Sequence, residues 1–582
     1  MEYSSIAEQK QNQLWERIPQ QWRLSPSQIP AGMHSPAESV TNVQYDRVNV
    51  LDIPRSCGLL SSKELEITQN WDIKGLLSQI HSKRVTAKEV IEAFCKRAAI
   101  AHQLTRCLTE PLFASALKRA EELDAHLNRT GTPIGPLHGL PVSLKDSFNI
   151  RGADSSVGIA SLALKPSEHD APLVTLLQSL GAIIITKTNV PQTMGALDSA
   201  NHLFGRTLNP LNRQLTAGGS TGGEGALVAL RGSMIGFGTD VGGSIRIPAM
   251  CNGLYGFKPS QGRVPYGGQT DGQPRSKGRI SIQAVAGPIA RSVSDIDAVM
   301  THLVPWAQWF GEDCIPGAWP SPLSSFDRNK KRPITIGVLP SDGLVHPLPP
   351  ISKVLNEVAA ALRCTPGVEV INIPVPRALS KCQAFAGRLM SVDGGISMLD
   401  HLEKSKEPLI PWLQTRMKRG KPLTLSQLAD LQAARGDIEI ELRRKLWIAG
   451  SGSNGNGSGT GHEQTIDAII HPVAPHPVPQ LDRYNAVGYT SSFVLLDYPA
   501  GTVPVRNFSE EDLERGVEIK ENVLGSWDKV NRELWDEKTV DRTVYLGSPL
   551  SVQVVTPRQH DYELFQAMDL IDRAIKTDRS KL

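Results

Sequence analysis

Length, composition and charge already exclude several classes of protein. The chain has 582 residues, of which 40% are hydrophobic and 21% charged, so most of it cannot be intrinsically disordered. Its 62 Lys and Arg residues nearly balance 59 Asp and Glu residues, for a net charge of +3. This balance, together with only 5% aromatic residues, argues against a nucleic-acid-binding protein, which needs a concentrated basic surplus and often base-stacking aromatics.

The first helical signals lie in the N-terminal fifth of the chain. We expect residues 1–75 to form an accessory helical segment that precedes one large domain, residues 76–582. Within that domain, Thr86 and Glu89 have the spacing of a capping box. Apolar residues follow at helical spacing, so the sequence predicts a helix over residues 86–101.

Short apolar segments then alternate with helical ones. Residues 139–146 (GLPVSLKD) and 182–186 (AIIIT) predict strands, and residues 171–181 between them predict a helix. Residues 336–340 (IGVLP) and 493–497 (FVLLD) predict further strands. Strands that alternate with helices indicate a layered α/β domain.

Other segments predict loops, a solvated helix face or a targeting signal. Residues 450–461 are rich in Gly and Ser and predict a flexible surface loop, and the polar residues 318–333 predict a second one. The basic residues within 441–447 indicate a solvated helix face. Ser580-Lys581-Leu582 matches the signal that the peroxisomal import receptor reads. We therefore expect that receptor as a partner and a peroxisomal location, with a chance match and a cytoplasmic location as the alternative.

The ends, cysteines and histidines give no sign of a membrane anchor or a metal. The sequence contains no apolar core of a signal peptide and no run of about 18 apolar residues. The 7 cysteines are scattered singly, which predicts a reducing compartment without structural disulfides or zinc. His471 and His476 in HPVAPHP have no third ligand nearby, so a loop is a better interpretation than a metal site. We expect no metal and no cofactor.

The glycines concentrate in residues 216–260, where two serines follow paired glycines. No phosphate-binding pattern of the G-x-x-x-x-G-K-[ST] or G-x-G-x-x-G kind fits this block, so the alternatives are plain tight turns or a catalytic loop. Glycines at 242 and 243 would let successive backbone N–H groups converge beside the Ser244 hydroxyl. That arrangement places a nucleophile next to an oxyanion hole. Ser220, in GGST, is the second serine of this kind.

A serine nucleophile needs a base, and the block contains no histidine. Lys145 ends the strand predicted at 139–146, on the face opposite its apolar residues. A lysine can act as a base near neutral pH if burial lowers its pKa by roughly three units. Asp146 would oppose that shift, but strand alternation points the two side chains apart. Spacing alone does not establish this Lys–Ser pair.

Several motifs together resemble the amidase signature family of serine hydrolases. They are GLPVSLKD, GGSTGGEGALVAL, GFGTDVGGSIRIPA and GLYGFKPS, with YTSSFVLLDYPAGTVPV and GSPLSVQVV further on. The resemblance runs from about residue 75 to the end. Residues 18–24 and 189–210 are most similar to the fungal acetamidase-like group. Fatty acid amide hydrolase is a more distant relative, whose membrane-anchoring helix we do not find here.

The resemblance implies a Ser-Ser-Lys triad. Ser244 would be the nucleophile, Ser220 the bridging serine in a cis-peptide position, and Lys145 the base. The oxyanion hole would consist of the backbone N–H groups of Val241, Gly242, Gly243 and Ser244. Thr221, Asp240 and Arg246 would support the site from behind, and the substrate would contact Met194, Gly195 and Ser220. Two departures from the family pattern are Thr221, where many relatives carry a second Ser, and Val494, where fungal relatives usually carry Asn.

The resemblance also implies a fold and a reaction. The fold is an α/β architecture with a large, mixed, twisted β-sheet of about eleven strands covered by helices on both faces. The reaction is hydrolysis of a carboxamide to a carboxylic acid and ammonia or an amine through an acyl-enzyme. The alternatives are an ammonia-releasing amidotransferase A-type subunit and, less favoured by the intact triad, a non-catalytic binding protein. The assembly state is open, with a homodimer as one alternative.

Overall fold

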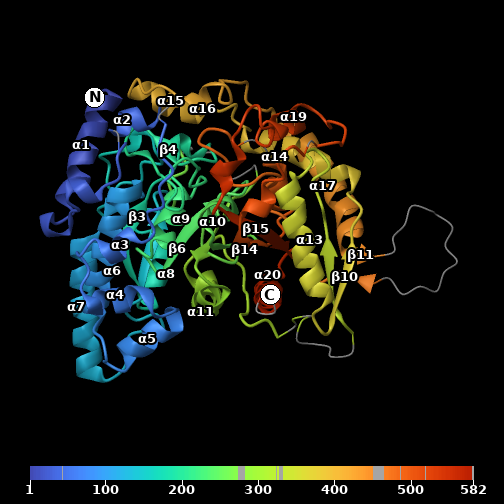
Figure 1. Cartoon of the computed structure of the whole chain (residues 1–582). Coiled ribbons are helices and arrows are strands. Elements are labelled where there is room, and N and C mark those ends of the chain that lie inside the picture. The colour runs from blue at the N-terminus through green and yellow to red at the C-terminus, as the bar shows by residue number, and fades with distance from the viewer. Residues whose placement is uncertain are drawn as a thin grey trace.

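A large mixed β-sheet lies at the centre of the molecule in this computed structural model (Figure 1). Its strands are β1 (Leu108–Pro111), β2 (Pro141–Lys145), β3 (Ile183–Thr188), β6 (Ile235–Asp240), β7 (Tyr255–Lys258), β8 (Val285–Ala290), β9 (Ile334–Val338), β10 (Val368–Asn372), β13 (Ala468–Pro472), β14 (Ala500–Asn507) and β15 (Pro549–Val555). The 11 strands follow the order β1-β3-β2-β6-β8-β7-β14-β15-β13-β9-β10. The β2–β3, β2–β6, β13–β9 and β9–β10 pairs are parallel and the others antiparallel. The predicted mixed α/β sheet is therefore confirmed.

The structure describes residues 1–582 with short gaps. The gaps are residues 34, 42–43, 273–281, 323, 325, 327–331, 450–463, 485–486, 518 and 580–582. The predicted loop 450–461, part of the predicted loop 318–333 and the Ser580–Leu582 signal therefore lie outside the described residues.

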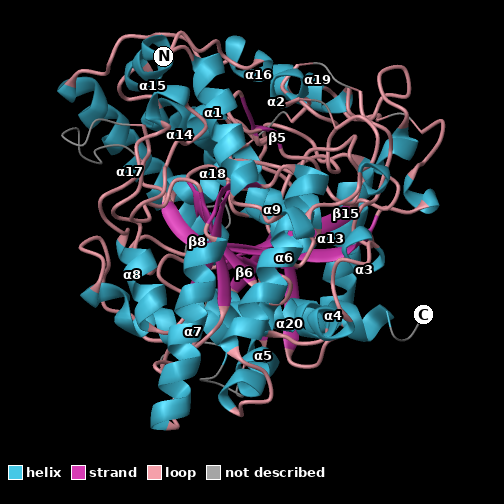
Figure 2. Cartoon of the chain, turned by 90° about the vertical axis from the view of Figure 1, so that its left-hand side faces the viewer, coloured by secondary structure: helices cyan, strands magenta, loops and turns pink. Residues whose placement is uncertain are grey.

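Helices lie on both faces of the sheet (Figures 1 and 2). Those of the N-terminal half are α1 (Tyr3–Glu16), α2 (Pro36–Ser39), α3 (Ile53–Ser56), α4 (Ser62–Gln69), α5 (Ile73–His81), α6 (Ala87–Thr105), α7 (Phe113–Thr130), α8 (Pro172–Ser179), α9 (Gly222–Ala229) and α10 (Arg246–Asn252). Those that follow are α11 (Val293–Leu303), α13 (Pro349–Arg363), α14 (Cys382–Met390), α15 (Ile396–Lys404), α16 (Pro411–Gln414), α17 (Leu425–Trp447), α18 (Gly488–Leu495), α19 (Ser526–Arg532) and α20 (Asp561–Arg579). Two small ladders, β4 (Ala200–Asn201) with β5 (Gly205–Arg206) and β11 (Ile448–Ala449) with β12 (Gln464–Thr465), lie outside the main sheet, and short 3-10 helices occur between the elements.

The strongest local signals of the sequence correspond to real elements. Every residue of β2 and β3 is buried, because helices cover both faces of these parallel strands. The predicted strands at 139–146, 182–186 and 336–340 are confirmed as β2, β3 and β9, and the helix predicted at 171–181 as α8.

Helix α6 begins where its capping box predicts. The Thr86 hydroxyl accepts a hydrogen bond from the Glu89 amide at 3.1 Å, and the Glu89 carboxylate accepts one from the Thr86 amide at 3.0 Å. These bonds satisfy two backbone donors that the first turn of a helix leaves free. Helix α6 then packs against α4, α7 and α9 and so supports the sheet that carries the candidate site.

The first 75 residues contain helices α1 to α4 and the first turn of α5, which ends at His81. Their buried side chains, such as Leu14 and Ile67, belong to the same hydrophobic cluster as the central strands. Helix α1 lies against β1 and contributes a lysine to the buried polar network described below. The boundary at residue 75 stays a prediction.

In the C-terminal third, the strand predicted at 493–497 is wrong, and the loop predicted for His471 and His476 holds only for His476, which lies in a bend after β13. Residues 493–497 are not a strand, because Phe493, Val494 and Leu495 end helix α18. A short apolar run that is buried on all sides does not distinguish a helix from a strand by its periodicity. His471 is not in a loop either, because it lies in strand β13, fully buried, and its ring stacks on Tyr489 at 4.9 Å.

The remaining predictions concern the solvated helix face, membrane-spanning helices and metal sites. Arg444 and Lys445 lie exposed on α17, so the solvated helix face is confirmed. Within the described ranges, we find no helix with the length and apolar character that a membrane span requires. The same part of the chain contains no group of three or more His, Cys, Asp or Glu side chains placed to hold a metal ion.

Candidate active site

The ends of two parallel central strands bring the predicted site together. Lys145 is the last residue of β2, and Asp240 is the last residue of the neighbouring strand β6. Because both strands are parallel, their carboxyl ends meet at one edge of the sheet, where sites of α/β proteins commonly form. Ser220 precedes α9 and Ser244 precedes α10, so both glycine-rich loops end in helices packed against each other.

Lys145 is buried among hydroxyl groups. Its Nζ donates hydrogen bonds to the Ser220 Oγ and to the Thr239 Oγ1, both at 2.7 Å. Burial lowers the pKa of Lys145 to about 7, although the more distant carboxylates of Asp240 and Asp146 oppose this shift. A large fraction of the amine is therefore uncharged at neutral pH, which a base requires.

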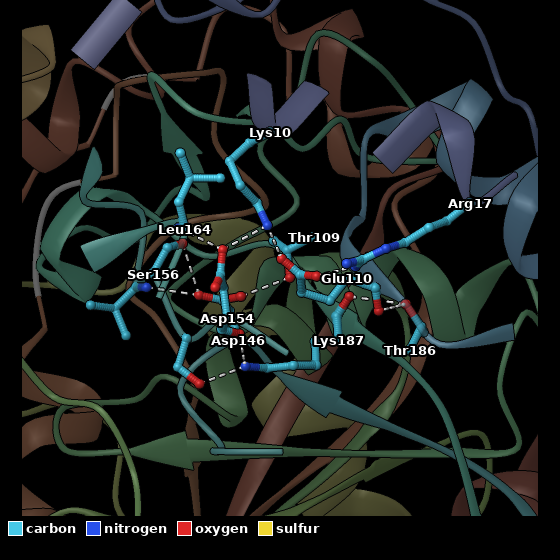
Figure 3. A network of polar contacts seen from close by, with 12 residues as sticks. Lys10, Arg17, Thr109, Glu110, Asp146, Asp154, Ser156, Leu164, Thr186 and Lys187 are labelled. Carbon is cyan, nitrogen blue, oxygen red and sulfur yellow. Dashed lines mark hydrogen bonds and ion pairs between the residues drawn. The ribbon is translucent and has the colours of Figure 1, made fainter. Parts of the chain in front are cut away.

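Asp146 follows Lys145 in the chain but faces another network (Figure 3). Its carboxylate accepts hydrogen bonds from the Thr109 hydroxyl and the Val157 amide, each at 2.7 Å. Strand alternation thus separates Asp146 from the Lys145 amine, as the sequence predicts.

The network around Asp146 contains two further buried lysines. Lys10 of α1 is paired with Glu110 and with Asp154, the latter at 2.8 Å. Lys187 of β3 donates to the Asp154 carbonyl oxygen and, at 2.6 Å, to the Ser155 hydroxyl. This network ties α1 to the edge of the sheet and lies apart from Ser220.

The loop before α9 needs its glycines for close packing. The backbone of Gly218 has a φ of +80°, and the Gly219–Ser220 peptide bond is cis, as the resemblance implied. A Cβ on Gly219 would lie 2.6 Å from the Ala196 carbonyl oxygen. The Thr221 methyl group fills the space above Gly238, where a Cβ would come within 2.3 Å of it.

Gly243 gives the Ser244 loop its shape. Its φ is +127°, and a Cβ there would lie 2.4 Å from the Thr490 hydroxyl, so this position requires glycine. The Gly243 amide donates to an Asp240 carboxylate oxygen at 2.6 Å. Of the four predicted oxyanion donors, this amide therefore already has an acceptor, and those of Val241, Gly242 and Ser244 remain as the predicted donors.

Buried polar groups hold that loop from behind. Two Arg246 nitrogens donate to Asp240, each at 3.0 Å. Burial would raise the pKa of Asp240, but the Arg246 charge outweighs it and keeps the pKa below its usual value. Arg246 also donates to Gln553 at 2.9 Å, and the Thr490 hydroxyl donates to the Gly242 carbonyl at 2.5 Å. The loop is thus fixed by a charged pair and two neutral side chains.

Sequence reasoning missed three of these groups: Thr239, Thr490 and Gln553. All three lie inside motifs that carry the family resemblance. For Thr239 a signal existed, because alternation along β6 places it on the face opposite Asp240. For Thr490 and Gln553 no local pattern predicts the contact.

The predicted substrate contacts lie near apolar helices. Met194 packs in a cluster with Val157, Ile159 and side chains of α15. A Cβ on Gly195 would lie 3.4 Å from Met417, which follows α16. Val494 is buried in the cluster against which Val241 packs, so this departure from the family pattern lies behind the oxyanion loop.

One link of the predicted relay is not a hydrogen bond in this structure. Ser244 is 7% exposed, and no hydrogen bond joins its hydroxyl to Ser220 in the described part of the chain. The structure therefore brings Lys145 and Ser220 into direct contact and places Ser244 in the adjoining loop.

Comparisons with known proteins agree with this architecture. The sequence model of the family described as Amidase matches residues 89–565. The chain belongs to the amidase signature family. An acetamidase of Emericella nidulans is 33% identical over 560 residues, which cover 96% of this chain and 95% of the acetamidase. An acetamidase of Aspergillus oryzae is 32% identical, with 96% of each chain covered.

Solved structures extend the comparison to the fold. Fatty acid amide hydrolase is 26% identical, with a TM-score of 0.80 and coverage of 98% of this chain and 95% of that one. A bacterial aryl acylamidase of the same family has a TM-score of 0.65 at 20% identity, covering 87% of this chain and 96% of that one, which supports the fold alone. This amidase is therefore a hydrolase that acts on amide C–N bonds.

Proposed function

We propose that this amidase cleaves a small or medium carboxamide to a carboxylic acid and ammonia or an amine through a Ser-Ser-Lys relay and an acyl-enzyme. The observation that carries the proposal is the buried Lys145 amine, 2.7 Å from the Ser220 hydroxyl. Its lowered pKa, about 7, allows a lysine to do the work for which many hydrolases use histidine.

The proposed reaction begins with proton transfer away from the nucleophile. Neutral Lys145 takes the proton of Ser220, and Ser220 takes that of Ser244 as the Ser244 Oγ attacks the amide carbonyl. Backbone N–H groups of the Ser244 loop stabilise the negative oxygen of the tetrahedral intermediate. For this step, the Ser244 hydroxyl turns toward Ser220, since catalytic hydrogen bonds often tighten only when substrate is bound.

The same relay then works in reverse. The proton held by Lys145 returns through Ser220 to the leaving nitrogen, because an amide nitrogen leaves poorly unless it is protonated. The C–N bond breaks, the amine departs, and the acyl group stays on Ser244. Water, activated by the same groups, hydrolyses that ester and regenerates the enzyme.

The share of the chain that resembles an acetamidase favours an enzyme that acts without a partner subunit. An amidotransferase A-type subunit would use the same residues to release ammonia. Similarity that covers 96% of this chain and 95% of an acetamidase supports instead an amidase that acts without a transferase partner.

A nucleophile test addresses the proposal directly. Ser244→Ala should lose labelling by a fluorophosphonate probe and lower turnover of an amide series of graded chain length by roughly 10³-fold or more. Ser115→Ala, an exposed serine of α7, is the matched control and should behave as wild type. An acyl-enzyme detected by mass spectrometry in Ser244→Ala would show that another residue is the nucleophile. Unlabelled wild type without turnover would favour the binding-protein alternative.

A further inference from the structure

A cavity lies at the far ends of the two helices that follow the candidate catalytic loops. Helices α9 and α10 begin two residues after Ser220 and Ser244, and their last residues, Ala229 and Asn252, line a cavity of about 570 Å³. This volume is within the usual range for small-molecule sites, roughly 300–1,000 Å³. With a rise of about 1.5 Å per residue, each helix places its far end roughly 10–12 Å from the serine loop. The cavity is therefore separate from the candidate active site.

Three arginines from different elements line this cavity. Arg97 comes from α6, Arg231 follows α9, and Arg291 follows β8. In the described portion of the chain, none of these three guanidinium groups forms an ion pair with a carboxylate. Arg55, at the exposed rim, is paired with Asp52 at 3.2 Å. The lining thus carries positive charge that the protein itself does not neutralise by direct contact.

Part of this arginine cluster has a structural explanation. The Arg97 Nε donates to the Leu230 carbonyl at 2.7 Å and its Nη1 to the Thr68 hydroxyl at 2.8 Å. Arg231 donates to the Gln69 carbonyl at 2.5 Å. These bonds satisfy carbonyl groups at the C-terminal ends of α9 and α4, where cations are favoured. Capping therefore accounts for one or two donors of each side chain.

Capping does not account for Arg291. Its Nη1 is buried and has no hydrogen-bond partner, and the described residues provide none for the rest of its guanidinium group. A buried donor without an acceptor costs free energy. Arg291 also lines the cavity, so an anion bound there would supply its guanidinium group with an acceptor.

The three charges also oppose one another. Burial, then Arg231 and Arg291, lower the pKa of Arg97 to about 9. Burial and Arg231 lower the pKa of Arg291 to about 10. The acidic groups in range, Asp295 and Asp72, already accept hydrogen bonds, Asp295 from the Ile73 amide and Asp72 from the Gly75 amide. A bound anion would relieve this repulsion.

We propose that this cavity binds the oxyanion group, phosphate or carboxylate, of a small soluble molecule. Guanidinium groups hold such groups through paired N–H donors in a planar fork. Gln69 and Asn70 also line the cavity, and their amide groups provide hydrogen-bonding partners for the rest of the molecule. The site is a binding site apart from the hydrolytic centre.

Calorimetric titration of the full chain tests this proposal. The probes are inorganic phosphate, a phosphate monoester (glycerol 3-phosphate) and a carboxylate (citrate), with ionic strength held constant by chloride. At least one probe should bind saturably with one-to-one stoichiometry at concentrations up to about 10 mM. Binding of phosphate and its monoester alone identifies a phosphate site, and binding of citrate alone identifies a carboxylate site.

Matched variants locate the binding. Arg291→Gln should weaken it at least tenfold without lowering Tm, because its guanidinium makes no hydrogen bond that folding would lose. Arg231→Gln should also weaken it, and Arg84→Gln, an exposed arginine, should bind as wild type. Saturable binding by none of the three probes, or equal affinity in Arg291→Gln, Arg231→Gln and wild type, overturns the proposal. Because heat of binding is the readout, the result is independent of amide hydrolysis.

Discussion

Lys10 and Lys145 are both almost completely buried, yet their surroundings give them opposite properties. Lys10 contacts two carboxylates, Glu110 and Asp154. Burial alone would lower the pKa of Lys10, but these carboxylates raise it above its ordinary value. Lys145 contacts two hydroxyl groups, and burial lowers its pKa to about 7. The groups that replace water around a buried amine therefore decide whether it stays charged.

Lys187 shows how closely these two environments lie together. In the parallel ladder between β2 and β3, Leu144 is opposite Lys187 and Lys145 is opposite Thr188. Alternation therefore sends Lys145 and Lys187 to opposite faces of the sheet. One face has the hydroxyl groups of the candidate relay. The other has the carboxylates that tie α1 to the sheet, which Figure 3 shows. The comparison predicts a catalytic lysine on one face and a structural lysine on the other.

The largest expected effect is on catalysis. Lys145→Met should lower kcat/KM for an amide by about 10³-fold, within the usual range for loss of a general base. It should not lower Tm, because no buried carboxylate loses its partner and the cost of burying the amine is removed. Steady-state kinetics on an amide and a matched ester measure the loss of kcat/KM. Lys118→Met, which replaces an exposed lysine, is the control. Equal losses on amide and ester would argue against proton return to the leaving nitrogen.

Lys10→Met should lower stability and leave catalysis nearly unchanged, which is the reverse of the effect expected for Lys145→Met. Glu110 and Asp154 would remain buried with part of their charge unpaired, so the free energy of unfolding should fall by about 3–5 kcal/mol. Turnover by the protein that remains folded should be close to wild type. Denaturant unfolding measures the loss. The control Lys406→Met breaks an exposed pair with Glu2 and should change the free energy of unfolding little. A similar loss of stability in Lys10→Met and Lys406→Met would contradict a structural role for the buried Lys10 pairs.

The two lysines also predict opposite pH dependences. Amide kcat/KM should rise with pH through a midpoint near 7, as Lys145 loses its proton, and an acid optimum would contradict that role. Because unfolded Lys145 binds its proton up to about pH 10.5, its contribution to unfolding free energy should increase between about 7 and 10.5. The contribution of Lys10 is present at lower pH and is lost as pH rises through its raised pKa. Unfolding of wild type, Lys145→Met and Lys10→Met from pH 7 to above pH 10.5 separates the two contributions, because the Lys10 contribution is lost only above 10.5.

The smallest effect concerns the second hydroxyl partner of Lys145. Thr239→Val removes one of two acceptors, so kcat/KM should fall by about tenfold and the pH midpoint should move to lower pH. Thr239→Ser keeps the hydroxyl group and should therefore have the kcat/KM and the pH midpoint of the wild type. A change in Tm without a shifted midpoint would mean that Thr239 acts only in packing.

Local sequence signals predicted the elements that local physics controls. The capping box of Thr86 and Glu89, the largely buried strands β2, β3 and β9, and helix α8 follow from short-range patterns. The prediction for 493–497 was wrong because an apolar run is compatible with either a helix or a strand when every side is buried. His471 was placed in a loop because neighbouring prolines hid strand β13, which ends at Pro472.

Motifs alone identify the residues that could carry the chemistry, because a lysine at a strand end and two serines after paired glycines are local patterns. Whether these side chains meet, and whether the lysine is charged, depends on how the chain folds. The contacts responsible join residues 94 positions apart for Lys145 and Thr239, 248 for Thr490 and Gly242, and 307 for Arg246 and Gln553. Desolvation depends on everything packed around an amine, and no local pattern contains that information.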